Sequence, residues 1–103
     1  MEGTYKLSKW KLPVIGTEIV IDKDSESNLS INLEKDGVVT VSGKLVTSGT
    51  VLLDMTTPQT GTWEKGDDGV VKISVGILQV NATVKGGEMV FESALLGKLT
   101  LKK

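Results

Sequence analysis

The sequence predicts an all-β protein, an antiparallel up-and-down meander that closes into a small barrel of eight to ten strands. Apolar and polar residues alternate along most of the chain, as they do in strands with one face toward a core. Turn-forming pairs such as Asp36-Gly37 and Gly86-Gly87 separate these segments, a pattern typical of β-hairpins. Val, Ile, Leu and Thr are frequent and Ala is scarce, which argues against long amphipathic helices. A strand roughly every ten residues is typical of sandwiches and barrels, and the consecutive hairpins favour the meander.

The first strand is expected to end at Leu12. Tyr5 and Leu7 share one of its faces, and Trp10 and Leu12 fall either on the other face or on the same face beyond a β-bulge. Pro13 ends the pairing because proline has no backbone donor.

A second strand is expected over residues 17–22. The polar loop that follows, over residues 22–28, has no apolar anchor, so we predict that it is the most mobile segment. Residues 29–34 and 38–42 then form the clearest hairpin of the chain.

The strand over residues 38–47 is expected to turn at Ser48-Gly49 and to return through residues 51–55. Thr56-Thr57-Pro58 should end this ladder, since proline withdraws a backbone donor.

Five further strands are predicted in the second half of the chain. Residues 59–65 pair with residues 70–75, and residues 78–85 form the most regular strand. The last two strands follow Gly86-Gly87 and Leu95-Leu96-Gly97.

A closed barrel requires its first and last strands to pair, which would place Tyr5 and Leu7 beside Leu99 and Leu101. The chain has 103 residues, 39% of them apolar, and this is enough for one domain over residues 1–103.

Composition excludes several classes of function. The formal net charge is -1, the two signs are scattered along the chain and Arg is absent, so we expect no nucleic-acid partner. Without Cys there is no disulfide and no thiolate zinc site. The apolar runs are too short to span a bilayer.

The sequence also lacks the usual catalytic side chains. Without His and Cys, the common general base and the most reactive nucleophile are missing, so we expect neither an enzyme nor a cofactor. Residues 22–28 carry oxygen ligands at alternate positions, like the start of a calcium loop. Ser27, however, stands where that loop needs Gly, and Leu33 stands where it needs a bidentate Glu, so we expect no metal site.

Several short motifs run in a defined order along most of the chain. They are Gly3-Thr4-Tyr5-x-Leu7, Leu29-Ser-Ile31-x-Leu33-x-x-Asp36-Gly37-x-Val39, Gly61-Thr62-Trp63, Val71-x-Ile73 and Val84-x-Gly86-Gly87-x-Met89-x-Phe91. Their order and spacing resemble those of the small bacterial lipocalin-like domains of the calycin group.

The resemblance implies a compact barrel that is exported or held at the bacterial cell envelope, often through a lipid anchor on the precursor. Met1-Glu2 fits either a native start or residues introduced where a signal or lipoprotein leader was removed, and the resemblance favours the second. The chain is shorter than full-size lipocalins, has Tyr5 where their first-strand motif has Trp, and lacks the Arg that packs over that Trp. These differences argue against a roomy ligand cavity.

Two functions follow as hypotheses. The first is the binding of a small apolar ligand in the barrel or at its mouth. The wall would be formed by Trp63, Ile73, Leu78, Val80, Met89 and Phe91. Core packing is the competing interpretation of these side chains, because a barrel of this size is just wide enough for its own residues.

The second hypothesis is a structural or protein-interaction domain of the cell envelope, with a filled core and no ligand. It would make its contacts through outward apolar residues such as Val20, Val38 and Leu52, if these converge on one face. The sequence leaves the oligomeric state open.

Overall fold

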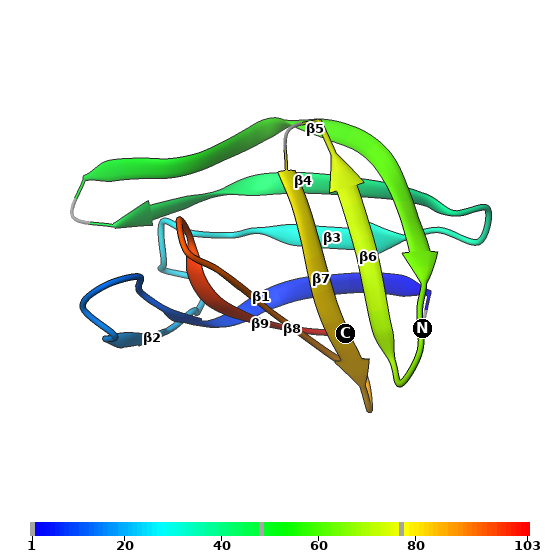
Figure 1. Ribbon diagram of the computed structural model, residues 1–103. Coiled ribbons are helices and arrows are strands. Elements are labelled where there is room, and N and C mark those ends of the chain that lie inside the picture. The colour runs from blue at the N-terminus through cyan, green and yellow to red at the C-terminus, as the bar shows by residue number, and fades with distance from the viewer. Residues whose placement is uncertain (1, 48, 77) are drawn as a thin grey trace.

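A computed structural model describes residues 2–47, 49–76 and 78–103 and confirms the all-β antiparallel meander (Figure 1). The strands in these residues are β1 (Gly3–Lys11), β2 (Glu18–Val20), β3 (Ser30–Leu33), β4 (Val38–Thr47), β5 (Thr50–Lys65), β6 (Val70–Val75), β7 (Leu78–Lys85), β8 (Glu88–Ser93) and β9 (Gly97–Lys102). They form one sheet in the order β2-β1-β3-β4-β5-β6-β7-β8-β9, and β1 also pairs with β9. Eight strands therefore close into a barrel, and the short β2 lies beside the second half of β1.

The barrel closes along the seam between β1 and β9. Leu7 pairs with Leu101 and Trp10 pairs with Leu99, and the register shifts just after Leu7. This shift is the β-bulge that the sequence allowed, and it lets Leu7 and Trp10 both face the core although they are three positions apart. Leu7 lies beside Leu101 as expected, but Trp10 rather than Tyr5 lies opposite Leu99.

The polar loop between β2 and β3 is fastened at its far end. β2 and β3 follow one another along the same edge of β1. Ser27, at the end of the loop, is buried, and its hydroxyl accepts a hydrogen bond from the Val46 amide (2.9 Å) and donates one to the Val46 carbonyl (3.1 Å). Part of the segment that we predicted to be mobile is thus bound to β4.

The expected break at Thr56-Thr57-Pro58 was wrong as a strand boundary, because β5 runs without interruption from Thr50 to Lys65. Only the pairing with β4 is interrupted at this tripeptide, and it resumes at Gln59 and continues to Thr62. Proline is tolerated here because the strand bulges at this point. No backbone N–H of Pro58 is then needed for pairing with β4. From Thr62 to Lys65 the strand pairs with β6 instead. The expected turn at Ser48-Gly49 falls partly outside the described residues, which omit Ser48.

The inward residues of all the barrel strands form one hydrophobic core. Among the described residues, the largest side chains with almost no solvent exposure are Trp10, Tyr5, Leu29, Ile31, Leu33, Leu45, Ile73, Met89, Leu99 and Leu101. They come from both halves of the chain, so the interior is occupied by the barrel's own side chains.

Because neighbouring strands are antiparallel, the connections alternate between the two ends of the barrel. The β1–β2, β4–β5, β6–β7 and β8–β9 connections share one end, and the β3–β4, β5–β6 and β7–β8 turns share the other. In Figure 1 the first end is marked by the β1–β2 and β4–β5 connections on the left, and the second by the β3–β4 turn on the right.

Candidate functional site: the apolar end of the barrel

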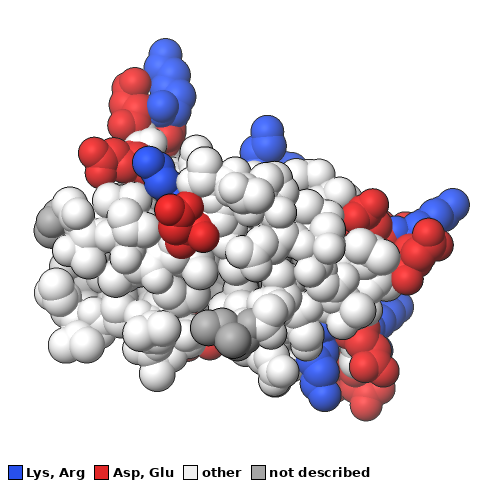
Figure 2. Space-filling model, turned by 90° about the horizontal axis from the view of Figure 1, so that it is seen from above, with Lys and Arg blue, Asp and Glu red and all other residues white. Residues whose placement is uncertain are grey.

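Exposed apolar side chains gather at one end of the barrel. Among the described residues, the large apolar side chains that stand in solvent are Val14, Ile15, Val20, Val38, Val51 and Leu95. All except Val38 belong to the β1–β2 connection, to β2, to the start of β5 or to the β8–β9 turn. We call these five residues the apolar end. Figure 2 shows uncharged side chains along much of the left-hand side, where this end lies, and a group of acidic and basic side chains that projects at the upper left.

The opposite end is charged. Its β3–β4 turn contains Lys35 and Asp36, and its β5–β6 turn contains Asp67 and Asp68. In Figure 2 acidic and basic side chains gather at the right-hand end. The barrel is therefore asymmetric along its length, because one end carries five of the six exposed large apolar side chains and the other carries only Val38 among the described residues.

The β1–β2 connection holds Val14 in a strained conformation. The Leu12 amide donates to the Thr17 carbonyl (2.8 Å) and the Gly16 amide donates to the Leu12 carbonyl (3.2 Å), which closes the loop. Within it the Ile15 amide donates to the Pro13 carbonyl (2.7 Å), and Val14 between them has φ 68°. This is a γ-turn with a positive central φ, a rare and strained type, and a β-branched residue makes it more costly.

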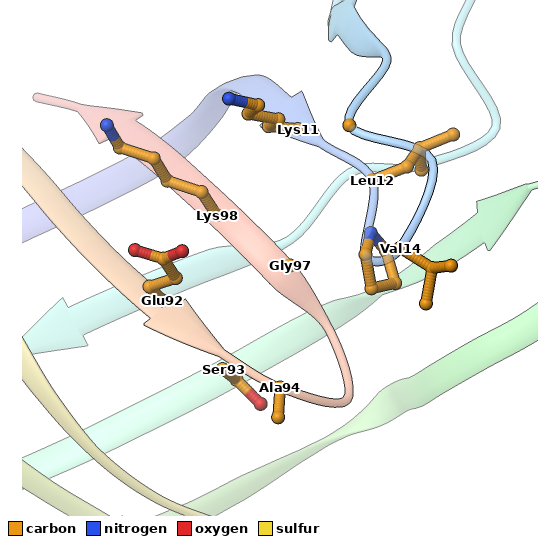
Figure 3. A pocket seen from close by; sticks show the side chains of 10 residues that line it. Lys11, Leu12, Val14, Glu92, Ser93, Ala94, Gly97 and Lys98 are labelled. Atoms are coloured by element: carbon orange, nitrogen blue, oxygen red, sulfur yellow. The ribbon is translucent and has the colours of Figure 1, made fainter.

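Two lysines stand directly behind this loop. Lys11 of β1 pairs with Lys98 of β9, so two like charges lie side by side across the seam. Figure 3 shows both side chains on the same side of the sheet, with Glu92 next to Lys98. Glu18 of β2 pairs with Lys11, and Glu92 of β8 pairs with Lys98, so each lysine also has a carboxylate on its outer side.

Two open hollows meet at this lysine pair. One, of about 390 Å³, lies between the β1–β2 connection and the β8–β9 turn and includes Pro13, Val14 and Ala94. The other, of about 380 Å³, extends along the strands past Lys9 and Thr100. Lys11 and Lys98 line both hollows. Three carboxylates, Glu18, Glu88 and Glu92, line the hollows as well, so lysines, carboxylates and apolar loop residues adjoin on one surface.

A smaller hollow of about 240 Å³ opens beside β2 at the same end. Trp10, Ile19, Ile21 and Val46 contribute its apolar lining. Trp10 itself is buried, and its indole Nε1 donates to the Leu96 carbonyl (2.7 Å). This hollow is the nearest feature to a mouth with an apolar wall.

The six residues expected to line a ligand cavity occupy three different positions. Ile73, Val80, Met89 and Phe91 lie in the buried core. Leu78 is half-buried at the start of β7, toward the apolar end. None of the three hollows described above is lined by any of the six.

Trp63 lies toward the charged end. Its indole Nε1 donates to the Glu34 carbonyl (2.7 Å) and its backbone amide donates to the Gly37 carbonyl (2.9 Å), so the residue is bound to the β3–β4 turn. Trp63 is also paired with Ile73, and Ile73 with Val80, so these three side chains form one row across β5, β6 and β7.

Carboxylates in the described part of the chain do not assemble into a metal site, since no three of them lie close enough to hold one ion. In the polar loop, Asp22 Oδ1 accepts from the Asp24 amide (2.9 Å) and from the Ser25 hydroxyl (3.3 Å).

The carboxyl of Asp54 in β5 accepts hydrogen bonds from the Thr56 hydroxyl and from the Thr56 amide. These hydrogen bonds, with a smaller effect of Lys44, lower the pKa of the Asp54 carboxyl below the usual value.

The outward apolar residues named from the sequence do not converge. Val20 and Val38 are exposed but lie at opposite ends, and Leu52 is half-buried against the core. The sequence pattern missed Val14, Ile15 and Leu95 because they lie in connections, where alternation carries no information. The signal that could have found them is the pair Val14-Ile15 between two turn residues, Pro13 and Gly16.

The fold and this end define an antiparallel β-barrel with a filled interior and an apolar, lysine-flanked tip. Comparison of the chain with known protein families, with curated proteins and with solved structures gave no match. Among the described residues no helix has the length and apolar character needed to cross a membrane.

Proposed function

We propose that this protein is a non-enzymatic, lipocalin-like interaction domain of the bacterial cell envelope that works through the outside of its apolar end. The single observation that carries the proposal is the position of the exposed large apolar side chains. Five of the six in the described residues lie at one end, and the turns of the other end are charged. A cluster of this kind typically marks a contact surface. The envelope location rests on the resemblance alone.

The filled interior favours this function over a ligand deep inside the barrel. Ile73 and Met89 have no solvent exposure and Phe91 has 2%. A ligand at their position would have to displace side chains that already pack to the density of a protein interior, which costs free energy. The contact surface is therefore expected on the outside.

The test compares retention of envelope components on the immobilised 103-residue chain. A variant carrying Ile15→Asp and Leu95→Asp places charges on the apolar end, and Val38→Asp places one at the charged end as a control. We expect the control and the unchanged chain to retain the same component and the double variant to lose it. Equal retention by all three proteins would refute the assignment of the contact to the apolar end.

A second candidate is a small apolar ligand bound at the mouth. The hollow that Trp10 shares with Ile19, Ile21 and Val46 favours it. Replacing Trp63, at the other end, with Phe leaves Trp10 as the single Trp. Addition of an apolar quencher to this variant should then quench Trp10 in a saturable way if the ligand site exists, and quenching that only rises in proportion to concentration would exclude it.

A further inference from the structure

We propose that the occupant of the apolar end is the surface of a lipid bilayer, with Val14, Ile15 and Leu95 entering the boundary between headgroups and acyl chains. Lys11 and Lys98 then lie at the level of the headgroups. This inference rests on the proposed function and names the partner of that same end.

The exposure and the shape of the tip fit a lipid surface. The exposed fractions are 104% for Val14, 75% for Ile15 and 73% for Leu95. The three side chains stand on two adjoining connections, since residues of both line the same hollow. They project from the barrel on either side of the open hollow that these connections share. A fluid bilayer adapts to such projections and removes them from water, which is the driving force of interfacial insertion.

The strain at Val14 supports a role for its side chain. Glycine adopts a positive φ without steric cost, so glycine would make the same γ-turn more stable. Val14 nevertheless occupies the position with its side chain entirely in solvent, where it contributes no packing to the barrel. Strain of this kind is characteristic of functional positions. On a bilayer the isopropyl group gains the burial that it lacks in the free protein.

The lysine pair gives the tip its charge preference. Two ammonium groups side by side repel each other, and an anionic headgroup between them relieves that repulsion. Lys11 and Lys98 are direct cross-strand neighbours in the β1–β9 pairing, and both line the two hollows behind the loop. Glu18 and Glu92 on the outer sides balance the two positive charges in number, so the attraction comes only from a headgroup seated between the two lysines. Anionic lipid should therefore strengthen binding moderately, and the apolar tip should supply most of it.

The experiment is co-sedimentation of the 103-residue chain with vesicles. One set of vesicles contains phosphatidylcholine alone, and the other contains phosphatidylcholine with phosphatidylglycerol. We expect binding to both, tighter binding to the mixed vesicles, and loss of that preference in high salt because exposed charges are screened. Absence of binding to either set would overturn the proposal.

Three variants separate the contributions. Ile15→Asp should weaken binding to both sets about tenfold or more, because burial of one such side chain contributes a factor of that order. The double change Lys11→Gln and Lys98→Gln should abolish only the preference for phosphatidylglycerol. Val38→Asp, at the charged end, should bind like the unchanged chain. Equal loss with Val38→Asp would show that the apolar end is not the docking surface.

The outcome is distinguishable from that of the proposed function. If the unchanged chain fails to bind vesicles but retains an envelope protein through Ile15 and Leu95, the lipid surface is wrong and the interaction end stands. If neither lipid nor any envelope component depends on these residues, both proposals fall. Circular dichroism of each variant confirms that a loss of binding is not a loss of fold.

Discussion

The ammonium group of Lys103 lies 5.6 Å from the centre of the Tyr5 ring. Tyr5 lies near the start of β1, and Lys103 follows β9 directly. The Lys103 amide donates to the Gly87 carbonyl (2.9 Å), which holds this residue in place. The pair therefore closes the barrel beside the β1–β9 seam.

Removing this cation should destabilise the fold slightly. We expect Lys103→Ala to lower the free energy of unfolding by about 0.5–1 kcal/mol, the typical value of an exposed cation–π contact. Lys103→Arg, which keeps a cation over the ring, should cost less. Urea unfolding of the three proteins measures the difference, and identical midpoints would show that the contact contributes nothing.

Stability should fall at high pH because of Tyr5. Burial raises the pKa of the Tyr5 hydroxyl above its ordinary value of 10.0, so the folded state holds the proton more tightly than the unfolded state does. The resulting stabilisation is fully present below pH 10.0 and is lost as the pH rises through the raised pKa.

The chain has one Tyr, so the ultraviolet absorbance of the ionised phenol follows Tyr5 directly. We expect the titration midpoint of the folded protein to lie above that of the urea-unfolded protein. As the pH rises over this range, the free energy of unfolding of the Tyr5→Phe variant should fall less than that of the unchanged chain. Coincident midpoints would contradict the buried environment of the ring.

Trp10 and Trp63 offer a matched pair of indole hydrogen bonds. Each Nε1 donates to a backbone carbonyl at 2.7 Å, but Trp10 is buried and Trp63 is half-buried. Trp10→Phe leaves the Leu96 carbonyl without its donor inside the protein, so we expect a cost of roughly 1–3 kcal/mol. Trp63→Phe should cost about 1 kcal/mol or less, since water can replace the lost donor. Chemical denaturation of both variants decides this, and equal costs would refute the difference in burial.

Ala substitutions at Gly97 and Gly86 distinguish the stability cost of a steric clash from the cost of a backbone conformation that glycine favours. Both have a positive φ, 88° and 59°, so Ala at either position should cost about 1–2 kcal/mol for the conformation. A Cβ at Gly86 would meet no atom within 4 Å, but at Gly97 it would collide with the backbone of Lys11 and Pro13. Gly97→Ala should therefore cost a further ~1–3 kcal/mol. If the two variants have the same melting temperature, β9 does not approach the β1–β2 connection as closely as described.

Replacing Val14 should stabilise the protein. Val14→Gly relieves backbone strain of about 1–3 kcal/mol and adds an entropic cost of about 0.5–1 kcal/mol, so the net effect is a rise in the free energy of unfolding. The control is Ile15→Gly, at a neighbouring position without a positive φ, and it should only destabilise. A fall in stability for Val14→Gly would show that the turn is not strained.

The sequence predicted the barrel because the alternation of its strands and the positions of its turns agree. The hairpin of β3 and β4 and the regular strand β7 show this agreement most clearly, because their inward residues are all apolar. The course of β5 was harder to predict. Pro58 stops a regular ladder, but a bulge can carry a strand past it, and local sequence does not reveal which occurs.

The apolar end could not be predicted for a different reason. Val14 and Leu95 lie in connections that are far apart in sequence, and only the closure of β1 against β9 brings those connections together. The row of Trp63, Ile73 and Val80 was correctly placed on the inner face, but whether an inner face is filled depends on how eight strands pack together, which periodicity does not describe.

The central claim, that the interior is filled and contacts are made from the apolar end, is tested most directly by methyl NMR during titration with a short-chain apolar amphiphile. The account predicts that the methyl signals of Val14, Ile15 and Leu95 shift and that those of Ile73 and Met89 do not. Shifts of the Ile73 and Met89 signals, with the loop signals unchanged, would show a ligand cavity inside the barrel and would contradict the account.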